Sequence, residues 1–295
     1  MPWRCAILGG MSQSDKQDRR ARAAARMGEP PPAPEALPRP VLDSHTHLDI
    51  VGGDPAEHIA AARAVGVDRL VQVGVDVTSS RWGVAVAQAH DAVLATVAVH
   101  PNEAPRLADL DEALREIEAL AAHPRVRAVG ETGLDVFRTG ADGRAAQEAS
   151  FRAHIAIAKR HGKALVVHDR DAHDDVLRVL DEEGPPDRVV MHCFSGDAAF
   201  ASECVKRGFT LSFAGTVTFA SASALREAAA ITPLDAVLVE TDAPYLTPMP
   251  YRGRPNGPYL IPLTVRGLAS AMDTDVDALC EAISTNGERI FGSWR

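Results

Sequence analysis

Cysteine is scarce in this sequence, and no two cysteines stand at a short spacing. The four cysteines, Cys5, Cys193, Cys204 and Cys280, are scattered through 295 residues. There is no C-x-x-C motif, and a disulfide framework is disfavoured. Scattered cysteines suit a reducing compartment, so we expect a cytoplasmic protein.

Long apolar runs and an excess of basic residues are also missing. No run approaches the ~20 apolar residues that span a bilayer, so we expect a soluble protein without a membrane partner. The formal net charge is -9, whereas proteins that bind long duplex DNA usually carry a basic surface. Any nucleic-acid chemistry must therefore depend on a local positive site.

The first 38 residues differ in composition from the rest of the chain. An Arg/Ala-rich run at 19–26 precedes a proline-rich tract at 30–40. Dense prolines are incompatible with a helix or a central strand, so we expect residues 1–38 to form a disordered tail. The basic run could touch nucleic acid, but a solvated tail is the favoured interpretation. Residues 39–295 then form the folded domain.

From Val41 onward, short Val-rich runs alternate with longer amphipathic stretches. The strand candidates are 41–48, 69–75, 93–100, 126–132, 164–168, 188–193, 210–213 and 236–241, and the helical candidates include 54–65, 109–122, 145–161, 173–183 and 221–230. Mostly unbroken apolar runs are typical of parallel strands buried on both faces. Eight such units predict an α/β fold, a closed (β/α)8 TIM barrel. The alternative, an open doubly wound sheet, would normally have a glycine-rich phosphate turn where DSHTH stands at 43–47.

Histidines gather at one position in this pattern. Five of the 11 histidines end predicted strands, namely His45, His47, His100, His168 and His192. The carboxyl ends of barrel strands form the face where catalytic residues collect. The other six lie in or beside helical segments, where we expect ordinary exposed or core histidines.

His45 and His47 lie two residues apart on a strand, so both side chains point to the same face. An H-x-H pair alone is weak evidence for a metal site. Other ligand-type residues also end strands and would converge on the same mouth: Glu131, His168, His192 and Asp242. Burying six such groups without an ion would cost several kcal/mol for each unpaired group. We therefore predict a metal centre.

Spacing separates this centre from two other metal-enzyme families. The metallo-β-lactamase signature H-x-H-x-D-H fails, because Ile50 stands at its last position. Many barrel amidohydrolases bridge two metals with a carboxylated lysine at the end of strand four, where this chain has Glu131. Lys163 precedes His168 by five residues and would lie about 16 Å back along its strand. Glu131 is then the natural bridging carboxylate.

Taken together, these motifs make the sequence resemble the TatD family of metal-dependent deoxyribonucleases, in the branch that keeps the first-strand H-x-H. The matching segments are DSHTHLD at 43–49, HP at 100–101, GETGLD at 130–135, VHDRDA at 167–172, HCFSG at 192–196, ETDAPYL at 240–246 and RGRPNGP at 252–258. They run in order from about Val41 to the C-terminus. The resemblance implies a TIM barrel whose divalent metal ligands are His45, His47, Glu131, His168, His192 and Asp242. It leaves the N-terminal extension unexplained.

A two-metal mechanism follows as a hypothesis. Two ions bridged by Glu131 would lie about 3.5–4 Å apart, one held by His45, His47 and Asp242 and the other by His168 and His192. Their positive charge would attract a phosphate despite the acidity of the chain. A water activated by both ions is the expected nucleophile, with Asp242 orienting it and taking its proton. Nitrogen-rich ligation favours Zn, Mn or Fe, while the resemblance also implies Mg.

Substrate contacts are expected from residues around the same mouth. Arg252 and Arg254 could bind phosphate bidentately, and Tyr245 could stack on an unpaired base. The alternative for the tyrosines of this proline-rich loop is simple packing. Arg170 is expected to contact phosphate, and His100 to contact substrate or to support a ligand. Glu240 is expected to be a structural acid beside the ligands.

The function predicted from the sequence is phosphodiester hydrolysis by a deoxyribonuclease acting as an exonuclease on single-stranded DNA ends. The alternative is an amidohydrolase-type enzyme that cleaves a small amide, ester or lactone, which suits an acidic protein. A non-enzymatic partner-docking protein would leave the six-residue cluster without a purpose. A monomer is compatible with the sequence, which does not specify the oligomeric state.

Overall fold

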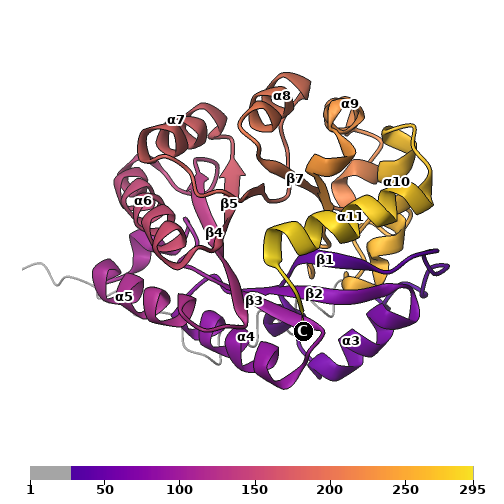
Figure 1. Ribbon diagram of the computed structural model, residues 1–295, viewed down its shortest axis with the longest axis horizontal. Coiled ribbons are helices and arrows are strands. Elements are labelled where there is room, and N and C mark those ends of the chain that lie inside the picture. Colours follow the sequence, from indigo (N-terminus) through magenta and orange to yellow (C-terminus); the bar gives the residue numbers. More distant parts are fainter. Residues whose placement is uncertain (1–27, 295) are drawn as a thin grey trace, which may run out of the picture.

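The computed structural model describes residues 28–294, which form a barrel of parallel strands inside a ring of helices (Figure 1). The strands are β1 (Val41–Thr46), β2 (Val67–Val73), β3 (Val93–Val97), β4 (Val126–Asp135), β5 (Ala164–Arg170), β6 (Val189–Met191), β7 (Thr210–Phe213) and β8 (Val237–Val239). They pair in sequence order, and every neighbouring pair is parallel. The predicted TIM barrel is thus confirmed.

Helices follow the strands along the chain and cover the outside of the barrel (Figure 1). They are α2 (Leu48–Val51), α3 (Pro55–Ala64), α4 (Val77–Ala89), α5 (Leu110–Ala121), α6 (Arg144–His161), α7 (His173–Glu183), α8 (Ala198–Lys206), α9 (Ser223–Ile231), α10 (Ile261–Ala271) and α11 (Val276–Phe291). Short 3-10 turns lie between them at η1 (Ala104–Arg106), η2 (Ala141–Gly143), η3 (Gly215–Thr218), η4 (Leu234–Ala236) and η5 (Pro258–Leu260). Several helices begin at an aspartate that accepts a hydrogen bond from the first turn, as Asp109 does from Glu112 N–H.

The barrel interior is filled by the Val-rich runs that predicted the strands. Every residue of β3 and β7 is buried, and the apolar residues of β5 are buried from both sides. Large side chains such as Phe151, on the inner face of α6, pack against this core. Burial on both faces explains why these strands lack the polar alternation of a half-exposed sheet.

Several strands end earlier than the sequence predicts. β3 stops at Val97 and β8 at Val239, so His100 and Asp242 stand in the following loops. At His100 the chain already turns, because its carbonyl accepts hydrogen bonds from the N–H groups of Glu103 and Ala104. The ladder ends there, while the side chains stay at the carboxyl end of the barrel.

The barrel closes at a seam between β1 and the segment that follows β8. Asp242 N–H donates to the carbonyl of His45 at 2.9 Å, and His47 N–H donates to the carbonyl of Ala243 at 3.0 Å. Thr46 and Ala243 form a parallel bridge. The seam therefore carries the H-x-H pair on one side and Asp242 on the other.

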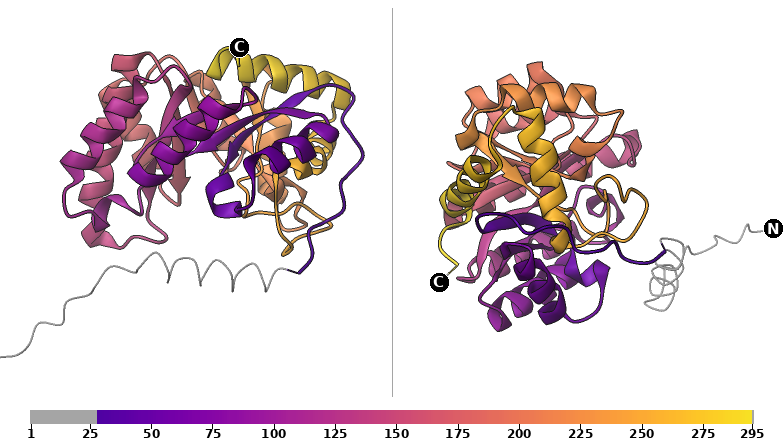
Figure 2. Two further views of the ribbon diagram at one scale, coloured as in Figure 1. Left: turned by 90° about the horizontal axis from the view of Figure 1, so that it is seen from below. Right: turned by 90° about the vertical axis from the view of Figure 1, so that its right-hand side faces the viewer.

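Residues 29–38, expected as part of a disordered tail, are instead bound to the barrel. Arg266 donates to the carbonyls of Glu35 and Ala36, and Leu37 N–H donates to the carbonyl of Val65. This strap, residues 29–38, runs along the outside of the molecule from the loop before α10 to the start of β1 (Figure 2). A proline-rich segment has few N–H donors, but its carbonyls still accept hydrogen bonds from neighbouring side chains. The rest of the predicted tail, including the basic run, lies outside the described residues.

Two further expectations concern the environment of the chain. None of the helices in residues 28–294 is long and apolar enough to cross a membrane. Within the same residues Cys193, Cys204 and Cys280 are all free thiols. The fourth cysteine, Cys5, lies outside the described part of the chain.

Candidate metal centre

The H-x-H pair occupies the mouth of the barrel at the seam. His45 and His47 are buried, and their Nε2 atoms lie 3.2 Å apart. The Nδ1 atom of His47 lies 3.2 Å from the carbonyl oxygen of Val73 on β2. The period of two along an extended chain therefore brings both rings to one point, as predicted.

Glu131, on β4, reaches into the space between two groups of imidazole nitrogens. Its Oε2 atom lies 3.4 Å from His45 Nε2 and 3.8 Å from His47 Nε2. Its Oε1 atom lies 2.6 Å from His168 Nδ1 and 3.2 Å from His192 Nε2. One carboxylate thus faces two separate sets of potential ligands.

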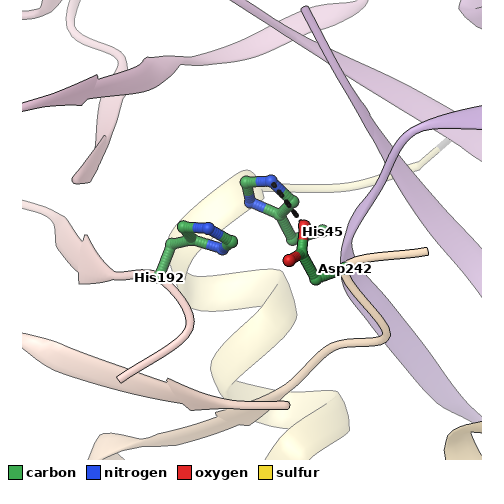
Figure 3. A group of neighbouring side chains, drawn as sticks. All are labelled: His45, His192 and Asp242. Atoms are coloured by element: carbon green, nitrogen blue, oxygen red, sulfur yellow. Dashed lines mark ion pairs between the residues drawn. The ribbon is translucent and has the colours of Figure 1, made fainter. Parts of the chain in front are cut away.

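Asp242 completes the first of these sets from across the seam. Its Oδ1 atom lies 3.4 Å from His47 Nε2 and 3.9 Å from His45 Nε2. Its backbone φ of 50° is left-handed, a conformation that aspartate adopts more readily than most residues. Figure 3 shows Asp242 beside His45, with the ring of His192 stacked on that of His45 at 3.5 Å between centroids.

The spacing of these atoms fits divalent ions. In a tetrahedral site with ligand bonds of about 2.1 Å, neighbouring ligand atoms lie about 3.4 Å apart. The distances measured from His45 and His47 Nε2 to each other and to Glu131 Oε2 and Asp242 Oδ1 are 3.2–3.9 Å. Three compact groups of ligand atoms are present in the described residues: His45, His47 and Glu131; His45, His192 and Asp242; and His100, Glu131 and His168. Imidazole with carboxylate is a donor set typical of Zn and other transition metals.

Electrostatics at the mouth favour cations. Burial would raise the pKa of Glu131, but His192 and His100 hold that pKa well below its usual range. Burial likewise opposes ionisation of Asp242, yet the hydrogen bond with His47 lowers the pKa of this carboxyl. Both carboxylates are therefore ionised at neutral pH and are available to a metal ion.

Acidic residues also stand behind two of the histidines. His168 Nε2 lies 3.3 Å from Asp135 Oδ2, and His192 Nδ1 lies 2.8 Å from Glu240 Oε1. Against the cost of burial, Asp135 and Glu131 raise the pKa of His168 to about 9. Both oxygens of Glu240 are buried, and their contact with His192 is an ion pair, because neither oxygen has a hydrogen-bond partner among the described residues. Such outer carboxylates orient metal-ligating histidines in many proteins.

Asp135 was not predicted as a site residue, although its spacing from Glu131 was a signal for it. Asp135 stands four residues after Glu131 on the same strand, so the period of two places both on one face. Its Oδ2 also accepts from Asn102 Nδ2 at 2.7 Å. The position of Lys163 matches the expectation that no lysine bridges the centre, because its Nζ donates to the carbonyl of Val126, at the opposite end of β4.

The expected substrate contacts lie at the end of β5 and in the loops at the same end of the barrel. The guanidinium of Arg170 lies 4.6 Å from the ring centroid of Phe137, which is 65% exposed. Arg252 lies over Phe219 at 4.4 Å, and Tyr245 is 51% exposed. The sequence analysis missed Phe137, which follows the strand that carries Glu131.

Arg254, which was expected to bind phosphate, instead donates hydrogen bonds to the strap. Its Nε and Nη2 atoms donate to the carbonyls of Glu29 and Pro30 at 2.9 and 3.1 Å. The hydroxyl of Tyr259 donates to the carbonyl of Pro31. The loop that was expected to bind substrate therefore also holds the strap.

The chain is similar to several known metal-dependent hydrolases. The model of the family described as TatD related DNase matches residues 42–292. A Mycobacterium tuberculosis protein named uncharacterized metal-dependent hydrolase TatD is 46% identical over 260 residues, which cover 85% of this chain and 98% of that protein. A Citrobacter rodentium protein named 3'-5' ssDNA/RNA exonuclease TatD is 35% identical over 81% of this chain and 92% of its own length. The crystal structure of YjjV, a TatD homologue from Escherichia coli, superposes with a TM-score of 0.79 at 26% identity, over 85% of this chain and 97% of that one.

Proposed function

This chain belongs to the TatD family and is a metal-dependent hydrolase that acts on ester bonds. We propose that it is an exonuclease that removes nucleotides from the ends of single-stranded DNA. The proposed centre would hold two divalent ions, Zn, Mn or Mg. His45, His47 and Asp242 would hold one ion, His168 and His192 the other, and Glu131 would bridge them.

The observation that carries this proposal is the position of the Glu131 carboxylate. Its two oxygens face different groups of imidazoles, with Oε2 toward His45 and His47 and Oε1 toward His168 and His192. Divalent ions at these positions would neutralise phosphate charge and lower the pKa of a bound water. The burial of Glu131 keeps bulk water from competing for its oxygens.

Asp242 is the residue proposed to take the proton of the attacking water. Its pKa is lowered by the hydrogen bond with His47, it lies at the mouth, and its side chain is more exposed than that of Glu131 (15% against 5%). Its Oδ1 is 3.4 Å from His47 Nε2, so the carboxylate is oriented by a ligand and still reachable from solvent. A general base must lie within hydrogen-bond reach of the proton that it removes.

Two observations support single-stranded nucleic acid as the substrate. The Citrobacter relative is named for single-stranded DNA and RNA. In this chain, Phe137 presents an exposed ring beside the Arg170 guanidinium, a pairing that can stack on a base and bind phosphate. Duplex DNA fits less well, because the chain carries a net charge of -9.

A monomer is sufficient for this proposal, because all six proposed ligands come from one chain. We also propose the cytoplasm as the place of action, since the thiols of Cys193, Cys204 and Cys280 are free.

The experiment is a comparison of substrates with a matched pair of variants. The purified protein, treated with chelator and then supplied with Zn, Mn or Mg, is given end-labelled single strands, duplexes, and a panel of small amides, esters and lactones. We expect shortening of the single strands only with added metal. Glu131→Ala and Glu131→Gln should abolish this activity and keep the circular dichroism of the wild type, while the exposed Glu57→Gln should change nothing.

Two outcomes contradict the proposal. Activity retained in Glu131→Ala would exclude the bridging role of this carboxylate. Turnover of a small amide, ester or lactone without turnover of single strands would identify an amidohydrolase-type enzyme instead.

A further inference from the structure

A fifth imidazole, that of His100, reaches the proposed centre from the loop after β3. Its Nε2 atom lies 3.3 Å from Glu131 Oε1, and the ring is largely buried. His100, Glu131 and His168 form one of the compact groups that could hold an ion. Distance alone therefore does not separate His100 from the ligands.

Each imidazole has an inner nitrogen, which faces the proposed centre, and an outer nitrogen, which faces away from it. The hydrogen-bond partner of the outer nitrogen distinguishes His100 from the ligands. The outer nitrogen of His47 faces the carbonyl oxygen of Val73, and those of His168 and His192 face carboxylate oxygens of Asp135 and Glu240, respectively. A carbonyl oxygen and an ionised carboxylate oxygen can accept a hydrogen bond but cannot donate one. The outer nitrogen must then carry the hydrogen, and in a neutral ring the lone pair is left on the inner nitrogen, ready for a metal.

His100 has the opposite arrangement. Its outer nitrogen, Nδ1, accepts a hydrogen bond from the backbone N–H of Asn102 at 3.0 Å. The lone pair is therefore on Nδ1, and the inner Nε2 carries the hydrogen. A ring nitrogen that carries hydrogen donates a hydrogen bond and does not bind a metal ion.

The turn that supplies this N–H is held firmly. The side chain of Asn102 donates to Asp135 and accepts from the hydroxyl of Thr139, at 2.7 Å in both cases. The carbonyl of His100 accepts from Glu103 and Ala104. The N–H of Asn102 is thus fixed against the ring, and this favours one tautomer.

We infer that His100 is a positioning residue of the proposed metal centre and not one of its ligands. It donates Nε2–H to Glu131 Oε1, which holds the carboxylate across the mouth and leaves another lone pair of the same oxygen for an ion. The inference rests on the proposed two-ion centre, but it does not depend on which substrate is cleaved. His45 is not assigned by this rule, because its Nδ1 has no hydrogen-bond partner within the described residues. The Nδ1 of His192 has none either, but it lies 2.8 Å from Glu240 Oε1.

The test counts bound ions in the full-length protein. Wild type, His100→Ala, His100→Gln and the ligand control His168→Ala are each saturated with Zn, freed of excess metal and measured by elemental analysis, and affinity is measured by chelator competition. We expect both His100 variants to bind as many ions as the wild type, with affinity about 10–100-fold weaker in His100→Ala. His100→Gln should recover part of that loss, because its amide N–H can donate to Glu131. His168→Ala should bind one ion fewer.

A loss of one ion in His100→Ala, matching His168→Ala, would overturn the inference. A second measurement needs no variant: nitrogen-15 NMR of the histidine rings in the Zn-loaded wild type reports which nitrogen carries hydrogen. Hydrogen on Nε2 of His100 supports the inference, and hydrogen on Nδ1 contradicts it. Neither the ion count nor the tautomer measurement involves a substrate. Both can therefore be interpreted even if the protein proves not to be a nuclease.

Discussion

Asp43 on β1 accepts hydrogen bonds from both the backbone N–H and the hydroxyl of Thr241, at 2.9 and 2.5 Å. Asp43 also accepts from the N–H of His45 at 3.2 Å. This fully buried carboxyl therefore joins the first strand to the segment after the last, at positions close in sequence to His45 and Asp242 on the two sides of the seam. Two proposed ligands that are distant in sequence are held together by a side chain that is not itself among the proposed ligands.

Removing the Asp43 carboxyl should weaken both the barrel and the centre. We expect Asp43→Ala to lower the free energy of unfolding by about 2–4 kcal/mol, because it leaves buried N–H groups without acceptors. Asp43→Asn should lose less, since its amide oxygen can still accept from His45 and Thr241. Urea denaturation of the chelator-treated proteins measures both values. Equal stabilities for wild type and Asp43→Ala would show that the seam is held by other contacts.

The exposed ring of Phe137 should contribute to the binding of single-stranded DNA but not to the binding of small esters. We expect Phe137→Ala to raise the KM for a single-stranded oligonucleotide about 5–150-fold, the range that corresponds to 1–3 kcal/mol for one base stack. Phe137→Trp, the matched variant, should keep an aromatic ring on which a base can stack, so its KM should stay near the wild-type value. Hydrolysis of a small phosphodiester without a base should be unchanged in both. An equal loss on both substrates would place Phe137 in the structure of the mouth and not in substrate binding.

Arg254 offers a way to separate strap anchoring from phosphate binding. Its guanidinium donates to the carbonyls of Glu29 and Pro30, so Arg254→Ala should lower stability by about 1–2 kcal/mol through the lost hydrogen bonds. The KM for single-stranded DNA should stay near the wild-type value, in contrast to Arg170→Ala, in which it should rise. Thermal unfolding and steady-state kinetics give the two readouts. A rise in KM without a change in stability would restore the phosphate contact expected from the sequence.

His154 should make stability depend on pH below neutrality. Its buried ring accepts from Val99 N–H at 3.0 Å through Nε2 and donates to the carbonyl of Ser150 through Nδ1, and burial lowers its pKa to about 4. Because the folded state disfavours protonation, this contribution is fully present above the unfolded pKa of 6.5 and is lost as pH falls toward 4. The loss amounts to about 3 kcal/mol.

Urea denaturation at pH 7 and at pH 4.5 measures this contribution. His154→Gln should be less stable than the wild type at pH 7, yet its stability should fall less between the two pH values. The comparison with the variant removes the contribution of carboxylates that titrate in the same range. Parallel losses in both proteins would show that protonation of His154 is not linked to unfolding.

Local patterns were enough to predict the strands and the main residues at the mouth. Val-rich runs separated by amphipathic segments predicted the barrel, because a parallel strand buried on both faces needs continuous apolar residues. The alternation of His45 and His47 placed both rings on one face. Strand ends were less accurate, as at His100, because hydrogen bonds of the following turn end the ladder and leave no composition signal.

The sequence by itself determined the fold class, the family and the residues that meet at the barrel mouth, since these depend on periodicity and on the order of motifs. Only the tertiary structure decided what lies behind each ring: Asp135 behind His168, Glu240 behind His192, and the N–H of Asn102 behind His100. It also decided that Arg254 binds the strap. These partners depend on the register between neighbouring strands and on the path of loops, which bring together groups that are distant along the chain.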